Sequence, residues 1–370
     1  MRLLYLCKQK YMRKDVIRDR YGRLYWLPHW LSRHHHLTAI TADYHPAPSS
    51  ERLHRLTEND DHLTWYSLPV HRLLIPTLLR YGALLRREFH DHPPDAVIGA
   101  SDSPHIILAS LVGRQYGAPV ILDLYDNFEA FGLSRIPGFK QLYRRALARA
   151  DAVTCVSRRL AEHVEARYRK SGAVFTIEST INDTDFQPMD KAAARRRLNL
   201  EVDCSYVGTA GALYASRGIE AVYSAFLEVV KTRPAVKLLL AGEIDPKAPP
   251  PEHDGVVYLG SLPHSDMNAF YGALDVAFNY MKDDEFGRYS FPQKAYEILA
   301  CKVPVLSARI GVFADLLEQD RFLYSPGNVE ELATKTLALL DQPEAPQTKI
   351  PSWADQADKL NEVIRGLRPR

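Results

Sequence analysis

The sequence alternates short apolar runs with longer amphipathic stretches, and this alternation begins a second time near residue 204. Short β-branched runs separated by helical patterns are typical of β-α-β units, which place parallel strands in one sheet. The strands predicted for the first half lie at 2–6, 37–41, 95–99, 119–124, 152–156 and 174–177. Those predicted for the second half lie at 204–209, 236–241, 256–259, 274–279 and 303–307.

Amphipathic stretches between these runs supply the predicted helices: 71–90, 104–116, 138–149 and 157–169, then 217–231, 265–272, 291–301 and 329–341. At about 150 residues per domain, 370 residues correspond to two domains. We place an N-terminal domain at 1–185, a C-terminal domain at 186–350 and a final helix within 351–370 that packs back toward the N-terminal domain. The predicted fold class is α/β, with two facing, doubly wound, Rossmann-like domains. Ligands of such sheets bind beyond the carboxyl ends of the strands, so we expect a ligand cleft between the domains.

Composition places the chain among ordinary globular proteins, with 46% hydrophobic and 25% charged residues. No run approaches the roughly 20 apolar residues of a membrane span, and we read no secretory signal at the start. The cysteines are far apart, which argues against zinc and disulfides and fits a reducing cytosol. We therefore expect a cytoplasmic protein.

Charge is distributed unevenly along the chain. Residues 1–170 hold 26 Lys+Arg against 17 Asp+Glu, whereas the remainder holds 21 against 28. The first half, at +9, is expected to meet something anionic, such as a membrane surface, a phosphorylated acceptor or nucleic acid. The alternative is an uneven but ordinary solvated surface.

Several motifs are absent, and this narrows the function. The sequence contains no Walker A motif, no Gly-x-Gly-x-x-Gly and no His-Glu-x-x-His. Gly99 and Ser101 begin like a nucleophile elbow, but Ser103 stands where glycine is required. Known RNA-binding motifs are missing, so nucleic acid is not an expected partner. The adjacent histidines 34–36 do not share a helix face, which favours a solvated helix end over a metal site.

The most informative segment covers residues 274–308, LDVAFNYMKDDEFGRYSFPQKAYEILACKVPVLSA. Ser290 and Gln293 read as a capping box, with Pro292 in the first turn of the helix that follows. The N-terminus of that helix would attract an anion. Lys294 and Glu297 are three residues apart and share one helix face. The lysine could meet a phosphate and the glutamate two ribose hydroxyls; the alternative is a surface Lys–Glu pair on a capped helix.

This segment resembles the donor-site segment of the large group 1 (family 4) glycosyltransferases of the GT-B fold. Further segments resemble the family in the same order: YVGTAGALYASRGIEAVYSAF, LLLAGE and VVYLGSLPHSDMNAFYGALDVAF in the second half, and LYRRALARADAVTCVSRRLAEHV with INDTDFQP in the first. The likeness covers the C-terminal domain well and the N-terminal domain from about residue 95 more loosely.

The resemblance implies a set of donor-binding residues. Glu297 would bind the ribose hydroxyls, and Lys294 with Arg217 would reach the diphosphate. The remaining donor-binding positions would let the backbone approach the donor closely, contact the base, or form the turn before the helix. They are Gly211, Gly242, Gly260, Ser261, Tyr289, Ser290, Phe291 and Pro292.

The chain also departs from the family pattern. The first carboxylate of the usual Glu-x7-Glu falls on Tyr289, and the nearest upstream carboxylate is Glu285. A second family cation falls on Gly211. Where many members carry a histidine in the N-terminal domain, this chain has Tyr125 and Asp126. We take Asp126 and Glu285 as candidate catalytic residues; capping of the following turn is the alternative role of Asp126.

The resemblance implies a metal-independent, hexosyltransferase-like enzyme that moves a sugar from a nucleoside diphosphate, UDP or GDP, to an acceptor hydroxyl with retention. The enzyme would act in the synthesis of cell-envelope polysaccharide or glycoconjugate, with a saccharide or lipid-linked acceptor and no cofactor. Its basic half would make peripheral contact with anionic membrane on the cytoplasmic face. An acidic metal cluster at 283–285 fits the tandem α/β pattern poorly. Two alternatives stay open: an epimerase or phosphorylase of the same fold, and a degenerate module that binds a nucleotide-sugar or a partner without catalysis.

Overall fold

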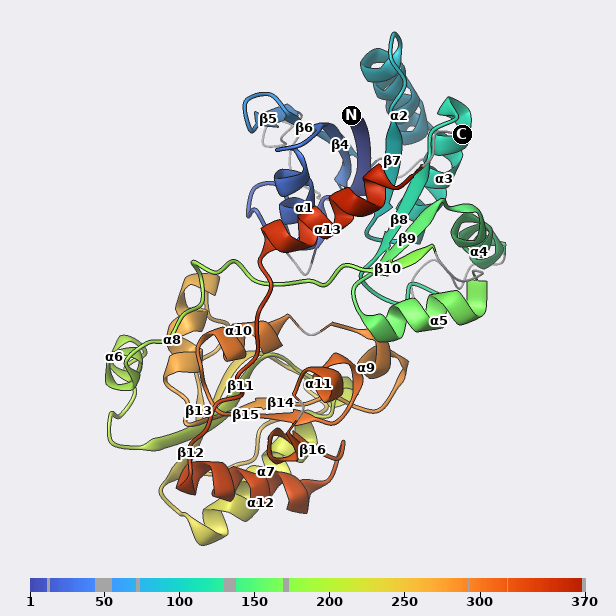
Figure 1. Cartoon of the computed structure of the whole chain (residues 1–370). Coiled ribbons are helices and arrows are strands. Elements are labelled where there is room, and N and C mark those ends of the chain that lie inside the picture. The colour runs from blue at the N-terminus through green and yellow to red at the C-terminus, as the bar shows by residue number, and fades with distance from the viewer. Residues whose placement is uncertain are drawn as a thin grey trace. The chain divides into compact units, whose positions relative to one another are not determined.

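The structure, a computed structural model, describes residues 1–11, 14–43, 55–70, 74–129, 138–168, 173–291, 293–317 and 319–367. The chain divides into two compact units (Figure 1). Unit 1 comprises Met1–Thr180 with Pro351–Arg370, and unit 2 comprises Ile181–Ile350. Each unit holds its own largely parallel sheet, so the predicted α/β class with two Rossmann-like domains is confirmed.

Unit 1 contains a sheet of eight strands in the order β10-β9-β8-β7-β1-β4-β6-β5. All its neighbouring pairs are parallel except β5 with β6. The strands are β1 (Arg2–Lys8), β4 (His36–Asp43), β5 (Arg55–Glu58), β6 (Leu63–Pro69), β7 (Ala96–Ala100), β8 (Val120–Leu124), β9 (Ala152–Cys155) and β10 (Val174–Thr176). A short antiparallel ribbon, β2 (Lys10–Tyr11) with β3 (Lys14–Asp15), follows β1. The carboxyl ends of β1, β7 and β8 therefore meet at one edge.

The helices of unit 1 are α1 (Arg23–Leu31), α2 (Leu74–Phe89), α3 (Ser103–Tyr116), α4 (Phe139–Arg149), α5 (Arg158–Tyr168) and the C-terminal α13 (Trp353–Arg365). Helix α13 packs against α1 and buries Trp353 and Leu360 in the unit 1 core (Figure 1). His35 Nε2 lies 2.7 Å from Asn361 Oδ1 of this helix, and both residues are buried. The expected solvated helix end at 34–36 is therefore wrong at His35, because α13 covers it.

The Arg23–Asp123 ion pair is buried inside unit 1. Arg23 Nε and Nη2 donate to the two carboxylate oxygens of Asp123 at 3.0 and 2.7 Å. Arg23 also donates to Ser179 Oγ, and Thr154 Oγ1 donates to Asp123. A buried pair tolerates desolvation only when its remaining hydrogen-bonding positions are satisfied, as they are here. The pair links α1 to β8 in the middle of the sheet.

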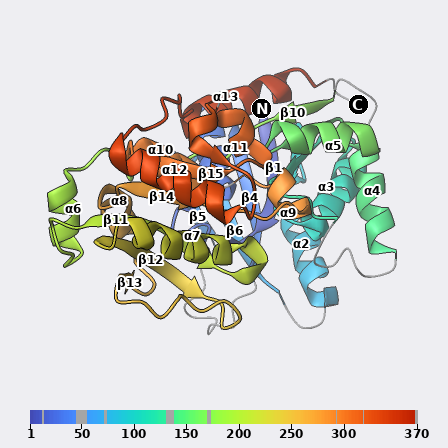
Figure 2. The same cartoon turned by 90° about the horizontal axis from the view of Figure 1, so that it is seen from below.

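Unit 2 contains a fully parallel sheet of six strands in the order β13-β12-β11-β14-β15-β16. The strands are β11 (Ser205–Leu213), β12 (Val236–Ile244), β13 (Val256–Tyr258), β14 (Val276–Asn279), β15 (Val305–Ala308) and β16 (Leu323–Tyr324). The α-helices are α6 (Lys191–Arg197), α7 (Ile219–Thr232), α8 (Met267–Gly272), α9 (Glu285–Tyr289), α10 (Lys294–Ala300), α11 (Gly311–Leu316) and α12 (Val329–Asp341). Helices α7 and α12 lie side by side (Figure 2). Short 3₁₀ helices lie at Ala215–Arg217, His264–Asp266 and Asp320–Phe322.

The predicted capping box at residue 290 is not formed. Helix α10 begins at Lys294, and Gln293, in helical conformation, precedes it without a side-chain cap. Ser290 instead ends α9, whose N-cap is Asp284; its carboxylate accepts from Gly287 N at 2.8 Å. Asp284 thus caps a short helix, α9, between the strand predicted at 274–279 and the helix predicted at 291–301.

No helix in the described residues combines the length and the apolar character that crossing a bilayer requires. His, Cys, Asp and Glu side chains in the same ranges form no group of three placed to hold a metal ion.

Candidate functional site

Two glycines face each other where β11 and β12 end in unit 2. Gly211 and Gly242 are paired in register, with φ of +113° and +116°. A Cβ at Gly242 would lie 1.9 Å from the carbonyl oxygen of Gly211, so close backbone approach requires glycine there. A Cβ at Gly211 would meet nothing within 4 Å. Gly211 therefore borders open space at the carboxyl edge of the sheet, where α/β proteins bind ligands.

Lys294, the first residue of α10, reaches this same edge. Its Nζ lies 3.5 Å from the carbonyl oxygen of Ala210 and 4.6 Å from the ring centroid of Tyr280. Tyr280 is fixed in turn by donating its hydroxyl to Ala212 O at 2.6 Å. Burial lowers the pKa of Lys294 to about 8; Glu297 opposes this shift and Arg217 adds to it. The ammonium group is thus held beside the end of β11 with its charge poorly solvated.

Glu297 lies one turn further along α10 and is 9% exposed. It accepts a hydrogen bond from Tyr271 Oη at 3.1 Å. Burial raises the pKa of Glu297 to about 7, although Tyr271 and Lys294 both act to lower it. Among the described contacts, Lys294 and Glu297 form no ion pair within 4.0 Å. The alternative of an exposed Lys–Glu surface pair is therefore wrong, since Glu297 is buried.

Arg217 provides a second cation near Lys294. It ends the 3₁₀ helix Ala215–Arg217, and its guanidinium carbon lies 3.3 Å from the ring centroid of Phe286. Its positive charge contributes to the lowered pKa of Lys294. Two neighbouring cations at the carboxyl edge of a parallel sheet favour a ligand with a negative charge.

The segment after β13 contributes backbone groups. The carbonyl oxygen of Gly260 accepts from Gly242 N at 2.7 Å, and Gly260 has φ of +70°. Tyr258 Oη donates to Gly242 O at 2.6 Å. Ser261 is exposed. A backbone hydrogen bond thus joins Gly242, in β12, to Gly260, in the segment after β13.

The structure places the predicted residues before α10 as follows. Glu285 is exposed at the start of α9, and Tyr289 is half-buried at its end. Ser290 Oγ is buried without a hydrogen-bond partner among the described residues. The ring of Phe291 packs 5.1 Å from that of Tyr296. Pro292 lies outside the described residues.

The acidic run 283–285 is engaged within unit 2. Asp283 accepts from Arg288 Nε at 2.6 Å, and Asp284 caps α9. Two of the three carboxylates therefore have partners inside unit 2: Asp283 in a surface ion pair and Asp284 in a helix cap.

In unit 1, Asp126 follows the end of β8. Its Oδ1 accepts from the N–H of the next residue, Asn127, at 2.8 Å. A cap would accept from a residue two or three positions further on, so the capping role of Asp126 stays a prediction. Lys8, at the end of β1, lies with its Nζ 5.5 Å from the ring centroid of Tyr125. Burial lowers the pKa of Lys8, while the negative charges of Asp102 and Asp126 act to raise it.

A second polar group at this edge of unit 1 was not predicted from the sequence. Asp102 caps α3, and its Oδ1 lies 2.5 Å from Nδ1 of the buried His105. Ser101, with φ of +89°, accepts from Lys8 N at 3.0 Å. The failed nucleophile-elbow pattern marked this segment, but only the fold brings it beside the end of β1. In unit 2 the missed residues are Tyr271, Tyr280 and Phe286, which orient Glu297, Lys294 and Arg217.

Two known protein families match the chain, one in each unit. The family described as glycosyl transferases group 1 matches residues 204–342. The family described as a glycosyl transferase 4-like domain matches residues 23–178. The chain belongs to the group 1 glycosyltransferases. Together the two matches cover most of both units and confirm the resemblance inferred from the sequence.

Curated relatives of this glycosyltransferase are distant. A D-inositol 3-phosphate glycosyltransferase from Segniliparus rotundus is 29% identical over 137 residues, covering 34% of this chain and 29% of the relative. One of the same name from Acidothermus cellulolyticus is 24% identical over 235 residues, covering 56% and 51%. A GDP-mannose-dependent phosphatidylinositol monomannoside mannosyltransferase from Corynebacterium glutamicum is 23% identical over 250 residues, covering 64% and 65%. The chain thus spans from under a third to under two thirds of these relatives' lengths.

Solved structures match this glycosyltransferase over nearly its whole length. Sucrose-phosphate synthase from Thermosynechococcus elongatus has a TM-score of 0.69 at 18% identity, with coverage of 99% of this chain and 95% of that one. HepE from Anabaena, solved with UDP and glucose, has a TM-score of 0.70 at 15% identity, with coverage of 99% and 100%. At these identities the likeness establishes the fold, which is that of the GT-B glycosyltransferases.

Proposed function

We propose that this group 1 glycosyltransferase transfers a sugar from a nucleoside diphosphate donor to an acceptor hydroxyl. The observation that carries the proposal is the arrangement of Lys294 and Glu297 in unit 2. Each is held by a neighbouring tyrosine at the carboxyl edge of the sheet, and they form no ion pair with each other. A buried carboxylate and a half-buried ammonium held apart in this way leave both charges for a ligand.

In this proposal each group of the donor meets a different part of the site. Lys294 and Arg217 neutralise the diphosphate, and Glu297 accepts hydrogen bonds from the two ribose hydroxyls. The backbone around Gly260 and Ser261 contacts the base, and the open space beside Gly211 lets the phosphates approach the main chain. Two fixed cations can stabilise the leaving diphosphate without a metal ion.

The reaction breaks the bond between the anomeric carbon and the diphosphate oxygen and forms a bond from that carbon to the acceptor oxygen. The acceptor hydroxyl gives up its proton to the departing diphosphate or to solvent, and the nucleoside diphosphate leaves with the bonding electrons. Lys294 and Arg217 act on the charge that grows on the leaving group, where electrostatic stabilisation contributes most. Asp126 and Glu285 stay predictions for contacts to the sugar or the acceptor. Retention of configuration and a hexose as the transferred sugar also stay predictions, carried by the family resemblance.

The donor is proposed to be a UDP- or GDP-sugar. HepE was solved with UDP and with UDP-glucose, and the C. glutamicum relative is named as GDP-mannose-dependent. Both donors share the ribose and the diphosphate that Glu297, Lys294 and Arg217 would bind. The choice between them rests on the base contacts after β13.

The acceptor is proposed to be a saccharide or a lipid-linked molecule of the cell envelope, reached at the cytoplasmic face of the membrane. The relatives described above are named for acceptors that contain inositol, one of them a phospholipid. In unit 1, helix α2 exposes Leu78 and Leu79 at 57% and 66% and ends with Arg86 and Arg87 in its last turn. Exposed leucines and arginines on one helix suit the surface of an anionic bilayer.

A non-catalytic nucleotide-sugar module is the second candidate. It is favoured by Tyr289, which replaces the first carboxylate of the family's usual pair, and by Gly211, which replaces a cation. Binding of a donor without release of nucleoside diphosphate would support this candidate over the enzyme.

The direct test is a thermal-shift screen with UDP-, GDP-, ADP- and dTDP-sugars, followed by an assay for nucleoside diphosphate release. A donor present at 100 times its dissociation constant stabilises the folded chain by about 2.7 kcal/mol. We expect one UDP- or GDP-sugar to raise the melting temperature and to be turned over when acceptor is added. No shift with any donor would contradict the proposal.

A further inference from the structure

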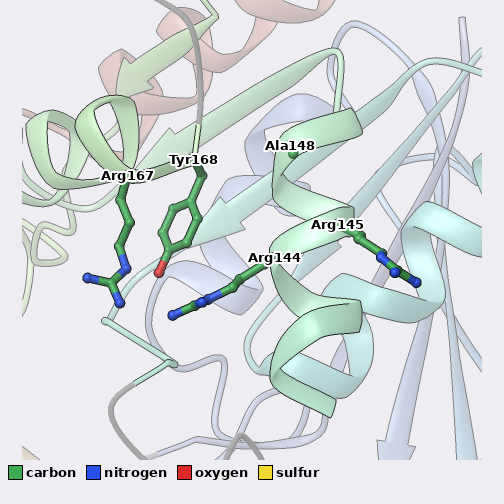
Figure 3. A pocket seen from close by; sticks show the side chains of 5 residues that line it. All are labelled: Arg144, Arg145, Ala148, Arg167 and Tyr168. Carbon is green, nitrogen blue, oxygen red and sulfur yellow. The ribbon is translucent and has the colours of Figure 1, made fainter. Parts of the chain in front are cut away.

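A basic cavity of about 460 Å³ opens in unit 1 between α4 and α5. It is lined by Arg144, Arg145, Ala148, Arg167 and Tyr168 (Figure 3). No acidic side chain is among these lining residues. None of them belongs to the proposed donor site, which lies in unit 2.

A buried carboxylate holds the cations beside this cavity. Glu129, in the segment after β8, has a side chain that is 5% exposed. Its Oε1 lies 2.8 Å from Lys140 Nζ and 3.3 Å from Arg167 Nη2, and it also accepts from Arg144. Three cations thus share one carboxylate oxygen, which leaves an excess of two positive charges. Glu129 fixes their positions without neutralising them.

Tyr168 adds a hydrogen-bond donor to these charges. Its hydroxyl is buried and has no hydrogen-bond partner among the described residues. The guanidinium carbon of Arg167 lies 5.8 Å from the centroid of the Tyr168 ring. Figure 3 shows this hydroxyl and the guanidinium groups of Arg144 and Arg167 pointing toward one space, whereas Arg145 points away from it. A buried hydroxyl without a partner costs free energy that a ligand acceptor would recover.

We propose that this cavity binds a phosphate group through Arg144, Arg167 and the hydroxyl of Tyr168. Guanidinium groups match the geometry of phosphate oxygens, and a phosphate monoester carries close to the two negative charges that the cluster lacks. The phosphate can belong to a lipid headgroup or to a soluble phosphate monoester, because the cavity presents the same donors to both. The inference goes beyond the proposed sugar transfer and uses other residues.

The test is calorimetric titration of the full chain with inorganic phosphate at low salt. We expect saturable binding that weakens about tenfold or more in Arg144→Gln and in Arg167→Gln, since each loses a hydrogen bond to a charged group. Arg196→Gln, at an exposed arginine of α6, removes the same charge elsewhere and should bind phosphate as the parent does.

The variant Tyr168→Phe distinguishes a loss of phosphate binding from a loss of folding stability. Arg144 and Arg167 also bind Glu129, so their substitution can weaken the fold, whereas the Tyr168 hydroxyl has no partner to lose. We expect Tyr168→Phe to keep the melting temperature in phosphate-free buffer and to bind phosphate several-fold more weakly. Phosphate affinity equal to that of the parent in Tyr168→Phe and in both arginine variants would overturn the proposal.

Vesicles distinguish the two sources of phosphate. Co-sedimentation compares phosphatidylcholine vesicles with and without phosphatidic acid, using the parent, Arg144→Gln and Arg196→Gln. Binding that needs phosphatidic acid and Arg144 supports a lipid headgroup, and binding of inorganic phosphate alone supports a soluble monoester. Absence of Arg144-dependent binding to either probe would overturn the inference and leave the donor-site proposal untouched.

Discussion

The hydroxyl of Tyr271 donates to the carboxylate of Glu297 at 3.1 Å, inside unit 2. Tyr271 belongs to α8 and Glu297 to α10, so the contact fixes the carboxylate from a neighbouring helix. Burial around the pair raises the pKa of Glu297 to about 7, which makes its ionised form costly in the absence of a ligand. The hydroxyls of a bound ribose would offset that cost.

Removing the charge of Glu297 should stabilise unit 2. Its pKa rises from 4.5 to about 7 on folding, so the folded chain holds the proton more tightly and loses stability as pH rises through this window. The gain in unfolding free energy of Glu297→Gln over the parent should grow from pH 4.5 to pH 7, reach about 3 kcal/mol at most, and stay constant above. Glutamine keeps an acceptor for Tyr271.

The measurement is urea unfolding followed by circular dichroism at several pH values. All four tryptophans, Trp26, Trp30, Trp65 and Trp353, lie in unit 1, so their fluorescence reports that unit separately as an internal control. Glu228→Gln, on the exposed face of α7, should show no such pH dependence. A gain that is independent of pH would contradict the placement of Glu297.

Lys294→Met should weaken donor binding about tenfold or more, because the diphosphate loses a charge-assisted contact. The fold should not suffer, since desolvation of this half-buried ammonium is costly and methionine has a similar shape. Calorimetry with the donor found in the screen measures the affinity. Lys231→Met, on α7, is the matched control, because that lysine is exposed and paired with Glu228. Equal donor affinities of Lys294→Met and Lys231→Met would contradict a role for Lys294 in donor binding.

Breaking the Arg23–Asp123 pair should destabilise unit 1 strongly. Arg23→Ala leaves a buried, unpaired carboxylate, and such losses cost about 3–5 kcal/mol. Tryptophan fluorescence during urea unfolding reports this unit. Arg18→Ala, at an exposed arginine, should change the unfolding free energy by less than about 0.5 kcal/mol. Similar stability in the two variants would show that the pair is not formed.

Helix α2 should support binding to anionic membranes. Leu78→Ser with Leu79→Ser should lower co-sedimentation with phosphatidylglycerol vesicles about tenfold or more, since two leucines lose burial in the bilayer surface. Leu111→Ser is the control, because Leu111 of α3 is 57% exposed and lies outside α2. Vesicle binding that depends on neither anionic lipid nor salt would contradict a membrane-binding role for the positive charge of unit 1.

Most of the fold could be predicted because central parallel strands are continuous apolar runs. The edge strands β10 and β13 were predicted, but β5, β6 and β16 were not. Strand β5 reads Arg-Leu-Thr-Glu and is at most half-buried, so it lacks the pattern of a core strand. Helix α1 contains Pro28 and is apolar on several faces, which hides its helical period. The cap at Ser290 fitted the local pattern, but Asp284 caps a helix six residues earlier.

The candidate site was predicted in part for a similar reason. Lys294 and Glu297 are three residues apart, so their shared helix face follows from spacing alone. Tyr271 precedes Glu297 by 26 positions, and Phe286 comes 69 after Arg217. Only the packing of unit 2 brings such partners together, so their contacts cannot be predicted from their spacing along the chain.

Donor turnover in Glu297→Ala tests the central claim most directly. Nucleoside diphosphate release is measured for the parent, Glu297→Ala and the control Glu228→Gln, with the donor from the screen and with acceptor present. We predict that Glu297→Ala loses most of the turnover, about 100-fold for two lost hydrogen bonds to a charged group, while Glu228→Gln keeps it. Undiminished turnover in Glu297→Ala would contradict the assignment of this carboxylate to the donor.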